Sequence, residues 1–419
     1  MIRPTLIHSL LALLLFATAC HNPSPHTKVE QAHLALQLMA SPPGKELSPE
    51  VVKALSWLHK AQAKDGGWGA GAHARQNVRN PHAVKTDPAT TAFVAMALLR
   101  AGNTLTEGQY HANLSQALDY LLNAVEDAKE QHTNITKLQG TQPQVKLGQN
   151  IDVAMTSQFF TRILPIVDVE REERLEHAIE ICLERIQNAQ DAQGGMAGGT
   201  WAGVLQDAMA NNALEEAKEF GFRVADSVVE KARANQAQNV DRSGAVLGGK
   251  SAGVSLYTYS STVRATAKEA KRAKSVIKEA YDRGDISQEY ATADDVPVNT
   301  EVLLDAGLSL DEAQKLERDF GVNAVAAERV QDKSVQAGFG NNGGEEFLSH
   351  MMTSESMYVM GGDSWEKWEK DITATLNKIQ NPDGSWSGHH CITSPVFCTA
   401  ACVLTLTVDR DASLLTAKE

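Results

Sequence analysis

The sequence predicts an all-α fold, an (α/α)6 toroid or barrel built from six helical hairpins. Helical periodicity recurs from about residue 48 to residue 407, and long alternating strands are absent. Six glycine-rich turns divide this stretch, and each one precedes a helix of small or apolar residues. Several of the turns also follow a more charged helix. A hairpin of this kind cannot bury its apolar face alone, so neighbouring hairpins stack, and six of them can close into a ring.

The first turn carries the clearest local pattern. Leu55, Leu58 and Gln62 share one face of a helix, and the glycines of 65–67 end that helix. Trp68 follows the turn and can fold back on it, while Gln62 can bind backbone groups left free where the helix stops. We therefore interpret these residues as structural.

Related turns recur around Gln190 and Gln380. Gln62 and Gln190 are 128 residues apart and Gln190 and Gln380 are 190 apart, so one period of about 64 residues fits both intervals. The intervening glycine-rich turns lie at 140–148, 243–253 and 338–344. The apolar inner helices are predicted at 88–101, 151–165, 200–216, 255–270, 345–360 and 394–407, and charged outer helices at 113–130, 171–188 and 365–380.

The amino terminus is predicted to be a lipoprotein signal peptide over residues 1–19. Its apolar run is too short to span a bilayer but suits a secretory signal. It ends in small residues before Cys20, which resembles the lipobox of bacterial lipoproteins, so Cys20 is the predicted lipidation site and membrane contact. An ordinary signal peptide cut nearby is the alternative. His21 follows Cys20, which by the same resemblance favours the outer membrane, facing the periplasm, over the inner membrane.

The remaining chain divides into three predicted parts. Residues 20–45 are rich in proline, serine, histidine and lysine and read as a flexible tether. The toroid extends over 46–410 and the tail over 411–419. Residues 284–337 do not fit the period, and we predict an insertion on the rim, either a lid or an elongated connection.

Composition restricts the function classes. The chain has 39 basic and 52 acidic residues, a formal net charge of −13. Nucleic acid is therefore an unsuitable partner, because phosphate binding requires a cationic face.

The first turn also points to a known family. Its pattern, Lys-Ala-x-x-Trp-Leu-x-x-x-Gln-x-x-Asp-Gly-Gly-Trp at 53–68, resembles the QW motif of squalene–hopene cyclases. The C-terminal block from Glu345 through 380–386 to Leu406 is similar to bacterial envelope proteins labelled prenyltransferase/squalene-oxidase repeat. The resemblance implies a terpenoid cyclase/protein prenyltransferase-like toroid. It does not carry an activity, because one fold hosts many functions.

The chemical motifs of the related families are missing from the sequence. Squalene cyclases protonate an alkene with an Asp-x-Asp-Asp run, which this chain lacks. Protein prenyltransferases hold zinc with an Asp-x-Cys pair and a histidine, and the pair is absent. Complement-type thioesters need a Cys-x-Glu-Gln turn, which is also absent. The sequence therefore argues against the chemistry of these namesakes.

A possible zinc site remains near the C-terminus. His389, His390 and Cys391 precede the last inner helix, and Cys398 and Cys402 share one face of it. These side chains could gather around zinc. Alternatively, Cys391 bridges Cys398 or Cys402 in an oxidising envelope, or the thiols pack like alanine. Cys182 is expected to be a packing residue.

Carboxylates and histidines at the starts of inner helices are candidates for acid–base chemistry. The candidate catalytic residues are Asp87, Asp152, Glu346 and His350, which would ring the mouth of a toroid. Asp87 and Asp152 are also suited to helix capping. The same mouth is expected to hold Glu345, Trp201, Tyr257 and Tyr259.

Taken together, the sequence predicts an envelope lipoprotein that binds a small hydrophobic ligand or an envelope protein in a central cavity, without cyclase chemistry. The alternative is a metal- or carboxylate-dependent enzyme acting on an isoprenoid or a glycan near His389, His390 and Cys391.

Overall fold

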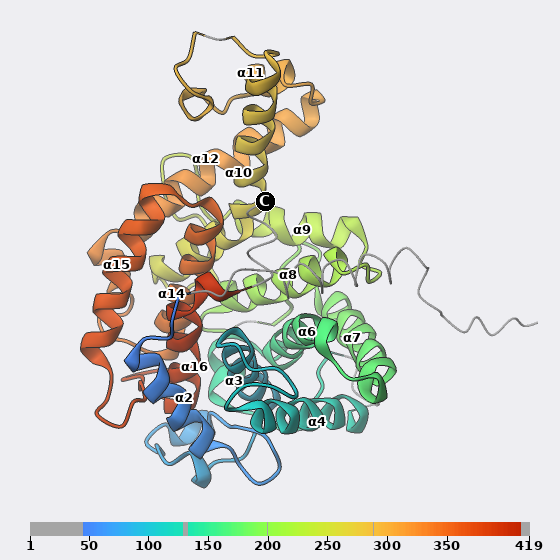
Figure 1. The fold of residues 1–419 in the computed structure, drawn as a ribbon, viewed down its shortest axis with the longest axis vertical. Coiled ribbons are helices and arrows are strands. Elements are labelled where there is room, and N and C mark those ends of the chain that lie inside the picture. Colours follow the sequence, from blue (N-terminus) through green and yellow to red (C-terminus); the bar gives the residue numbers. More distant parts are fainter. Residues whose placement is uncertain (1–44, 129–132, 199, 288, 412–419) are drawn as a thin grey trace, which may run out of the picture.

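The computed structural model describes residues 45–128, 133–198, 200–287 and 289–411. Within these ranges the chain is all-helical and contains no strand, as the sequence predicts. Two layers of helices form a ring (Figure 1).

Among the described residues the inner layer has six helices, each starting at or after one of the six predicted turns. They are α3 (Pro88–Arg100), α6 (Ile151–Ile163), α8 (Gly203–Glu219), α10 (Ser255–Arg283), α14 (Gly344–Met360) and α16 (Pro395–Leu406). Each contacts the next in chain order, and α16 packs against α3, which closes the ring. The predicted toroid is therefore confirmed.

The outer layer pairs one helix with each inner helix. Its members are α2 (Pro49–Ala61), α4 (His111–Asp127), α7 (Val169–Ala189), α9 (Asp226–Ala237), α12 (Leu310–Val330) and α15 (Gly362–Ile379). The short helices α5 (Gln142–Lys146), α11 (Thr300–Asp305) and α13 (Lys333–Gln336) lie in connections, as do the 3-10 turns η1 (His73–Arg75), η2 (Pro81–Ala83), η3 (Leu164–Ile166) and η4 (Ala293–Asp295), while η5 (Val408–Arg410) follows α16.

The glutamine of each clear motif joins consecutive outer helices. Gln62 Nε2 donates to the Gly66 carbonyl in its own turn (2.8 Å) and to the Asn113 carbonyl in α4 (3.0 Å). Gln190 Nε2 repeats the pattern on Gly194 and on Val228 of α9. The motif glutamines Gln62 and Gln190 thus have a structural role, as the sequence predicts.

The third motif closes the ring. Gln380 Nε2 donates to the Glu50 carbonyl in α2 at 2.9 Å, so the last outer helix is tied to the first. Trp57 Nε1 donates to Asp383 across the same junction. Gly384 has a φ of +93°, and a Cβ there would lie 2.9 Å from the Lys53 backbone. Only glycine fits this turn without strain.

The motif tryptophans fold back as the sequence predicts. Trp68 Nε1 donates to the Leu58 carbonyl and Trp386 Nε1 to the Leu376 carbonyl, both at 2.9 Å. Both indoles are buried. Burying an indole while satisfying its N–H gives each turn a rigid apolar anchor.

The core of the molecule is the inner layer. Almost every side chain of α3, α6, α8, α14 and α16 is buried, including faces that point away from the outer helices. The described inner wall is therefore covered by other atoms of the chain rather than by solvent.

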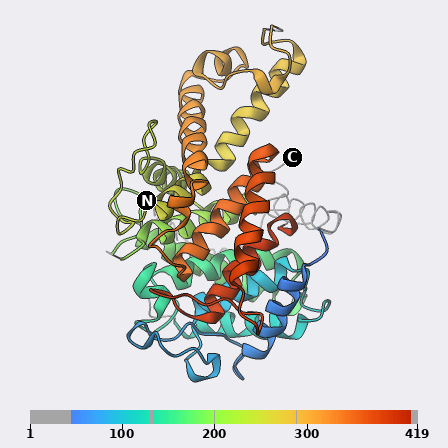
Figure 2. The ribbon, with the colours of Figure 1, turned by 90° about the vertical axis from the view of Figure 1, so that its left-hand side faces the viewer.

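The segment 284–337, which we predicted as an insertion, includes α12, an outer helix of the repeat. Helix α10 extends beyond the ring and α12 returns antiparallel to it, so the pair projects as an arm (Figures 1 and 2). The arm has its own apolar cluster, which includes Ile277, Leu303 and Leu316. Because α12 is the outer helix of the fifth hairpin, the segment is an elongated hairpin connection around α11.

The predicted signal peptide 1–19, the lipidation site Cys20 and the tether 20–45, apart from Lys45, lie outside the described residues. Lys45 itself bonds Glu369 through Nζ at 2.5 Å. No described helix is long and apolar enough to cross a membrane.

Candidate functional site

The loops before the inner helices lie at one end of the ring, which we call the mouth. The predicted candidate residues fall here. Asp87 is the N-cap of α3 and accepts bonds from the Thr90 and Ala70 amides, each at 2.8 Å. Burial raises its pKa. Both carboxylate oxygens are used to hold backbone, which is the capping role that the sequence also offered.

Asp152 is fully buried beside Asp87. It accepts bonds from the Ala89 amide (3.1 Å) and from Gln144 Nε2 (2.7 Å). Burial, reinforced by the Asp87 charge, raises the pKa of Asp152 to about 7. The two carboxyl groups thus couple neighbouring inner helices and are covered by protein.

Glu346 and His350 lie on α14 and are both buried. Glu346 accepts from Tyr257 Oη at 2.6 Å and from the Gly343 amide at 2.8 Å, so it orders the start of the helix. His350 has no hydrogen-bond partner at Nδ1, and burial lowers its pKa to about 4. His350 is therefore neutral near pH 7 and sits beside the Trp368 ring.

The predicted metal ligands are not assembled into one set. No group of three or more histidine, cysteine or acidic side chains in the described residues has metal-binding geometry. His389 is exposed, whereas Cys398 and Cys402 are fully buried in α16. The described cysteines, Cys391, Cys398, Cys402 and Cys182, are free thiols, so the alternative disulfide is not formed here.

Cys391 is nevertheless unusual in its backbone. Its φ is +57°, a left-handed conformation that disfavours a side chain. Burial and the neighbouring Glu345 raise the pKa of its thiol to about 12. The thiol is therefore protonated and a poor nucleophile.

A row of ring contacts crosses the mouth from the loop before α6 to the loop before α16. Lys146 Nζ lies 4.7 Å from the centre of the Trp201 ring, a cation–π contact. Trp201 meets Phe339 edge-on at 5.8 Å, and Phe339 meets His390 edge-on at 5.2 Å. We call Lys146, Trp201, Phe339 and His390 the aromatic row. Phe339 is 55% exposed, so the row presents an apolar ring to solvent.

Two buried polar atoms in the aromatic row lack hydrogen-bond partners. Trp201 Nε1 is a donor with nothing to accept from it. His390 Nε2 faces the Asn341 carbonyl, with Glu346 Oε2 3.8 Å from the same nitrogen, while Nδ1 is buried without a partner. An unmet indole donor and an unpartnered imidazole nitrogen therefore flank the exposed ring of Phe339.

Glu345 adds a third unmet group at the mouth. One oxygen accepts from the Ile392 amide at 3.1 Å, but Oε1 is buried without a partner. Burial, with the charge of Glu346, raises the pKa of Glu345 to about 8, and Lys146 is close enough to oppose the shift. Glu345 is therefore a neutral carboxyl at pH 7, able to donate as well as accept.

The opposite end of the ring is closed by a cycle of buried ion pairs. Each member lies between two partners of opposite charge, in the order Arg100, Glu355, Arg264, Glu216, Arg162, Asp411 and back to Arg100. We call these six residues the charge ring. Five come from five different inner helices, and Arg100 also donates to the Leu404 carbonyl on the sixth.

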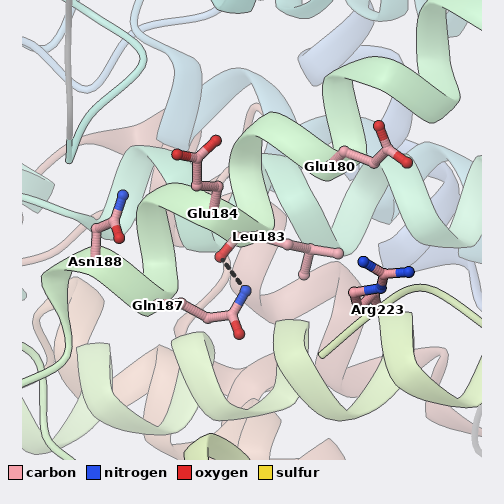
Figure 3. Close-up of a pocket in the computed structure, with 6 residues that line it drawn as sticks. All are labelled: Glu180, Leu183, Glu184, Gln187, Asn188 and Arg223. Atoms are coloured by element: carbon pink, nitrogen blue, oxygen red, sulfur yellow. Dashed lines mark hydrogen bonds between the residues drawn. The ribbon is translucent and has the colours of Figure 1, made fainter. Parts of the chain in front are cut away.

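A separate pocket of about 510 Å³ lies outside the toroid (Figure 3). It is lined by Glu180, Leu183, Glu184, Gln187 and Asn188 of α7 and by Arg223 from the loop before α9. Gln187 is already bonded to the Leu183 carbonyl of its own helix. The pocket is a groove between charged surface side chains, and we assign no chemistry to it.

Sequence reasoning placed Trp201, Glu345 and His390 at the mouth but missed Lys146 and Phe339. A signal for Phe339 was present, because one aromatic residue stands in a turn otherwise rich in glycine and asparagine, 338–344. The charge ring was missed as well, although Arg100 and Arg162 end apolar helices at nearly the repeat spacing.

A comparison with known families agrees with this architecture. Residues 31–140 match the family model of the squalene-hopene cyclase C-terminal domain. The match covers the first motif and the helices α2, α3 and α4, and it confirms the recognition of a prenyltransferase/squalene cyclase repeat in this segment. No curated protein matches the chain significantly.

Proposed function

We propose that this chain is a binding protein of the cell envelope, held to the membrane through lipidated Cys20, and that it binds its partner at the mouth without cyclase chemistry. The observation that carries the proposal is the aromatic row, where an exposed ring lies between two buried nitrogens without partners, Trp201 Nε1 and His390 Nδ1. Buried polar atoms without partners are costly, so a partner that satisfies them gains free energy on binding.

The interior is a less suitable place for a ligand than the mouth. Almost every side chain of α3, α6, α8, α14 and α16 is buried, and the charge ring crosses the closed end. An apolar polyene placed there would have to displace packed side chains and lie beside buried ions, which is unfavourable. We therefore propose that the binding site lies at the mouth, and not in the central cavity that the sequence predicts.

The unmet groups favour a peptide-like partner carrying an apolar side chain. Trp201 Nε1 needs an acceptor and His390 Nδ1 lacks a partner, and one peptide unit supplies both a carbonyl and an N–H. The ring of Phe339 contacts both side chains, and we infer that an aromatic or aliphatic side chain of the partner replaces it there. The neutral Glu345 carboxyl beneath can accept or donate one further bond. A polypeptide segment of an envelope protein meets all of these requirements.

The test uses N-acetyl-phenylalanine amide as a minimal probe, with the full chain purified in detergent. Binding is followed by saturation-transfer NMR. Trp201→Ala removes the unmet donor and the ring contact, and should weaken binding about tenfold. Phe339→Ala removes the side chain that competes with the probe and should strengthen binding.

Leu310→Ala is the matched control, because Leu310 is about as exposed as Phe339 (52%) but lies on the arm. It should leave probe binding unchanged. The proposal fails if the probe binds equally well to the wild type and the Trp201 and Phe339 variants, or if Phe339→Ala weakens binding as much as Trp201→Ala.

A further inference from the structure

The charge ring has one member that differs from the other five. Arg100, Arg162 and Arg264, like Glu216 and Glu355, project from inner helices that are fixed by their neighbours. Asp411 instead follows the 3-10 turn η5, outside the ring of helices.

Asp411 also balances the charge of the ring. The five helical members comprise three arginines and two glutamates, a net charge of +1, and the Asp411 carboxylate neutralises it. Oδ2 of Asp411 lies 3.3 Å from Arg162 Nη1 and is also bonded to Arg100 Nη2. Two guanidinium groups from different helices therefore converge on a single oxyanion, the geometry in which arginine binds carboxylates and phosphates.

This part of the ring is nearest to solvent. The Arg162 and Asp411 side chains are 9% and 5% exposed, whereas the other members are 2–3% exposed. The residues before Asp411 have their own anchors, because Val408 is buried and Asp409 accepts from the Lys45 amide at 3.2 Å. The turn η5 is thus held by contacts that do not involve the Asp411 side chain.

We propose that Arg100 and Arg162 form an oxyanion-binding site at the closed end of the toroid, and that the Asp411 carboxylate is its built-in occupant. The ligand class is a carboxylate with one negative charge, presented by a small molecule or by a chain terminus. This inference is independent of binding at the mouth, since none of the six residues contributes to the aromatic row.

Chemical rescue tests the site. Asp411→Ala removes the carboxylate but keeps Cβ, leaving space for formate between the two guanidinium groups. The thermal unfolding midpoint of the full-length variant should fall below the wild type and rise by about 2–4 °C, saturably, when formate replaces chloride at equal ionic strength. The wild type should show no such rise, because its own carboxylate fills the site.

Two further variants keep the test decisive. Asp411→Glu retains a carboxylate and should be stable and insensitive to formate. Asp409→Ala, two residues away but outside the charge ring, should also be insensitive. If Asp411→Ala does not fold in chloride, refolding yields in formate and chloride replace the midpoint, and a higher yield in formate supports the site. Equal responses of Asp411→Ala to formate and chloride would overturn the proposal.

Discussion

Arg100 and Glu355 form a buried ion pair, with Nη2 and Oε1 2.5 Å apart and both side chains 2% exposed. They belong to α3 and α14, which are not neighbours in the ring, since α16 lies between them. The pair therefore links helices across α16 and ties the start of the chain to its end. The same glutamate also meets Arg264 at 3.1 Å, so its loss would leave two arginines without a full set of partners.

Glu355→Gln should strongly destabilise the fold. Removing one partner of a buried ion pair leaves uncompensated charge and costs about 3–5 kcal/mol. Urea unfolding measures the free energy. Lys218→Ala breaks an exposed pair with Asp226 and should change the free energy of unfolding far less. Equal losses in the free energy of unfolding for the two variants would show that the charge ring does not stabilise the fold.

Asp152 and Glu345 should each lower stability as pH rises from about 4 to about 8, whereas His350, whose pKa burial lowers from 6.5 to about 4, opposes this trend below about pH 6.5. Burial raises the pKa of Asp152 from 3.8 to about 7 and that of Glu345 from 4.5 to about 8. Between these limits the folded state retains protons that the unfolded state has lost, so each unit of rising pH disfavours folding. The free energy of unfolding at pH 5, 6, 7 and 8 measures the slope.

Asp152→Asn and Glu345→Gln should flatten that slope, since neither amide titrates. Asp383→Asn is the control, because Asp383 is an exposed acid in the third motif turn. It should leave the slope as in the wild type. Equal slopes for the wild type and both amide variants would contradict the burial of protonated carboxyls.

Gln380→Ala should open the junction between the last and first outer helices. Its Nε2 bonds to the Gly384 and Glu50 carbonyls would be lost, at a cost of about 2 kcal/mol for two backbone acceptors left without a donor. Gln331→Ala is a suitable control, because Gln331 Nε2 donates to the Ala327 carbonyl in the last turn of the adjoining helix α12 and not to another outer helix. Similar unfolding energies for both variants would argue that the motif glutamine does not close the toroid.

Cys20→Ala should release the protein from membranes, because acyl chains on this cysteine are the proposed anchor. Cell fractionation followed by immunoblotting measures the distribution. Cys391→Ala is the control, because Cys391 lies in the folded domain, where its backbone is left-handed. This variant should stay membrane-bound. Retention of Cys20→Ala in the membrane fraction would remove the lipoprotein assignment.

The fold was predictable because its signals are local and repeated. Gln62 and Gln380 each bind a glycine carbonyl four residues later, and that spacing is visible in the sequence. The same turns set the starts of the inner helices, and α3 and α14 begin within one residue of prediction. A 64-residue period then leaves few architectures other than a ring.

The site was predictable only in part, because it depends on contacts between distant loops. Trp201 and Phe339 are 138 positions apart, and no periodic pattern pairs them. Arg100 and Glu355, 255 positions apart, likewise meet only after the ring has closed. Asp87 and Asp152 lie at the mouth, and the Asp87 bond to the Thr90 amide is the capping role that the sequence offered. The Asp152 bond to the Ala89 amide joins two helices and could not be predicted from the sequence.

Hydrogen exchange with and without N-acetyl-phenylalanine amide tests the central claim, binding at the mouth of a closed toroid, most directly. We predict slower exchange in the loops that hold Trp201, Phe339 and His390, with no change in α3 and α16. Protection confined to the inner helices, with these three loops unaffected, would contradict the account.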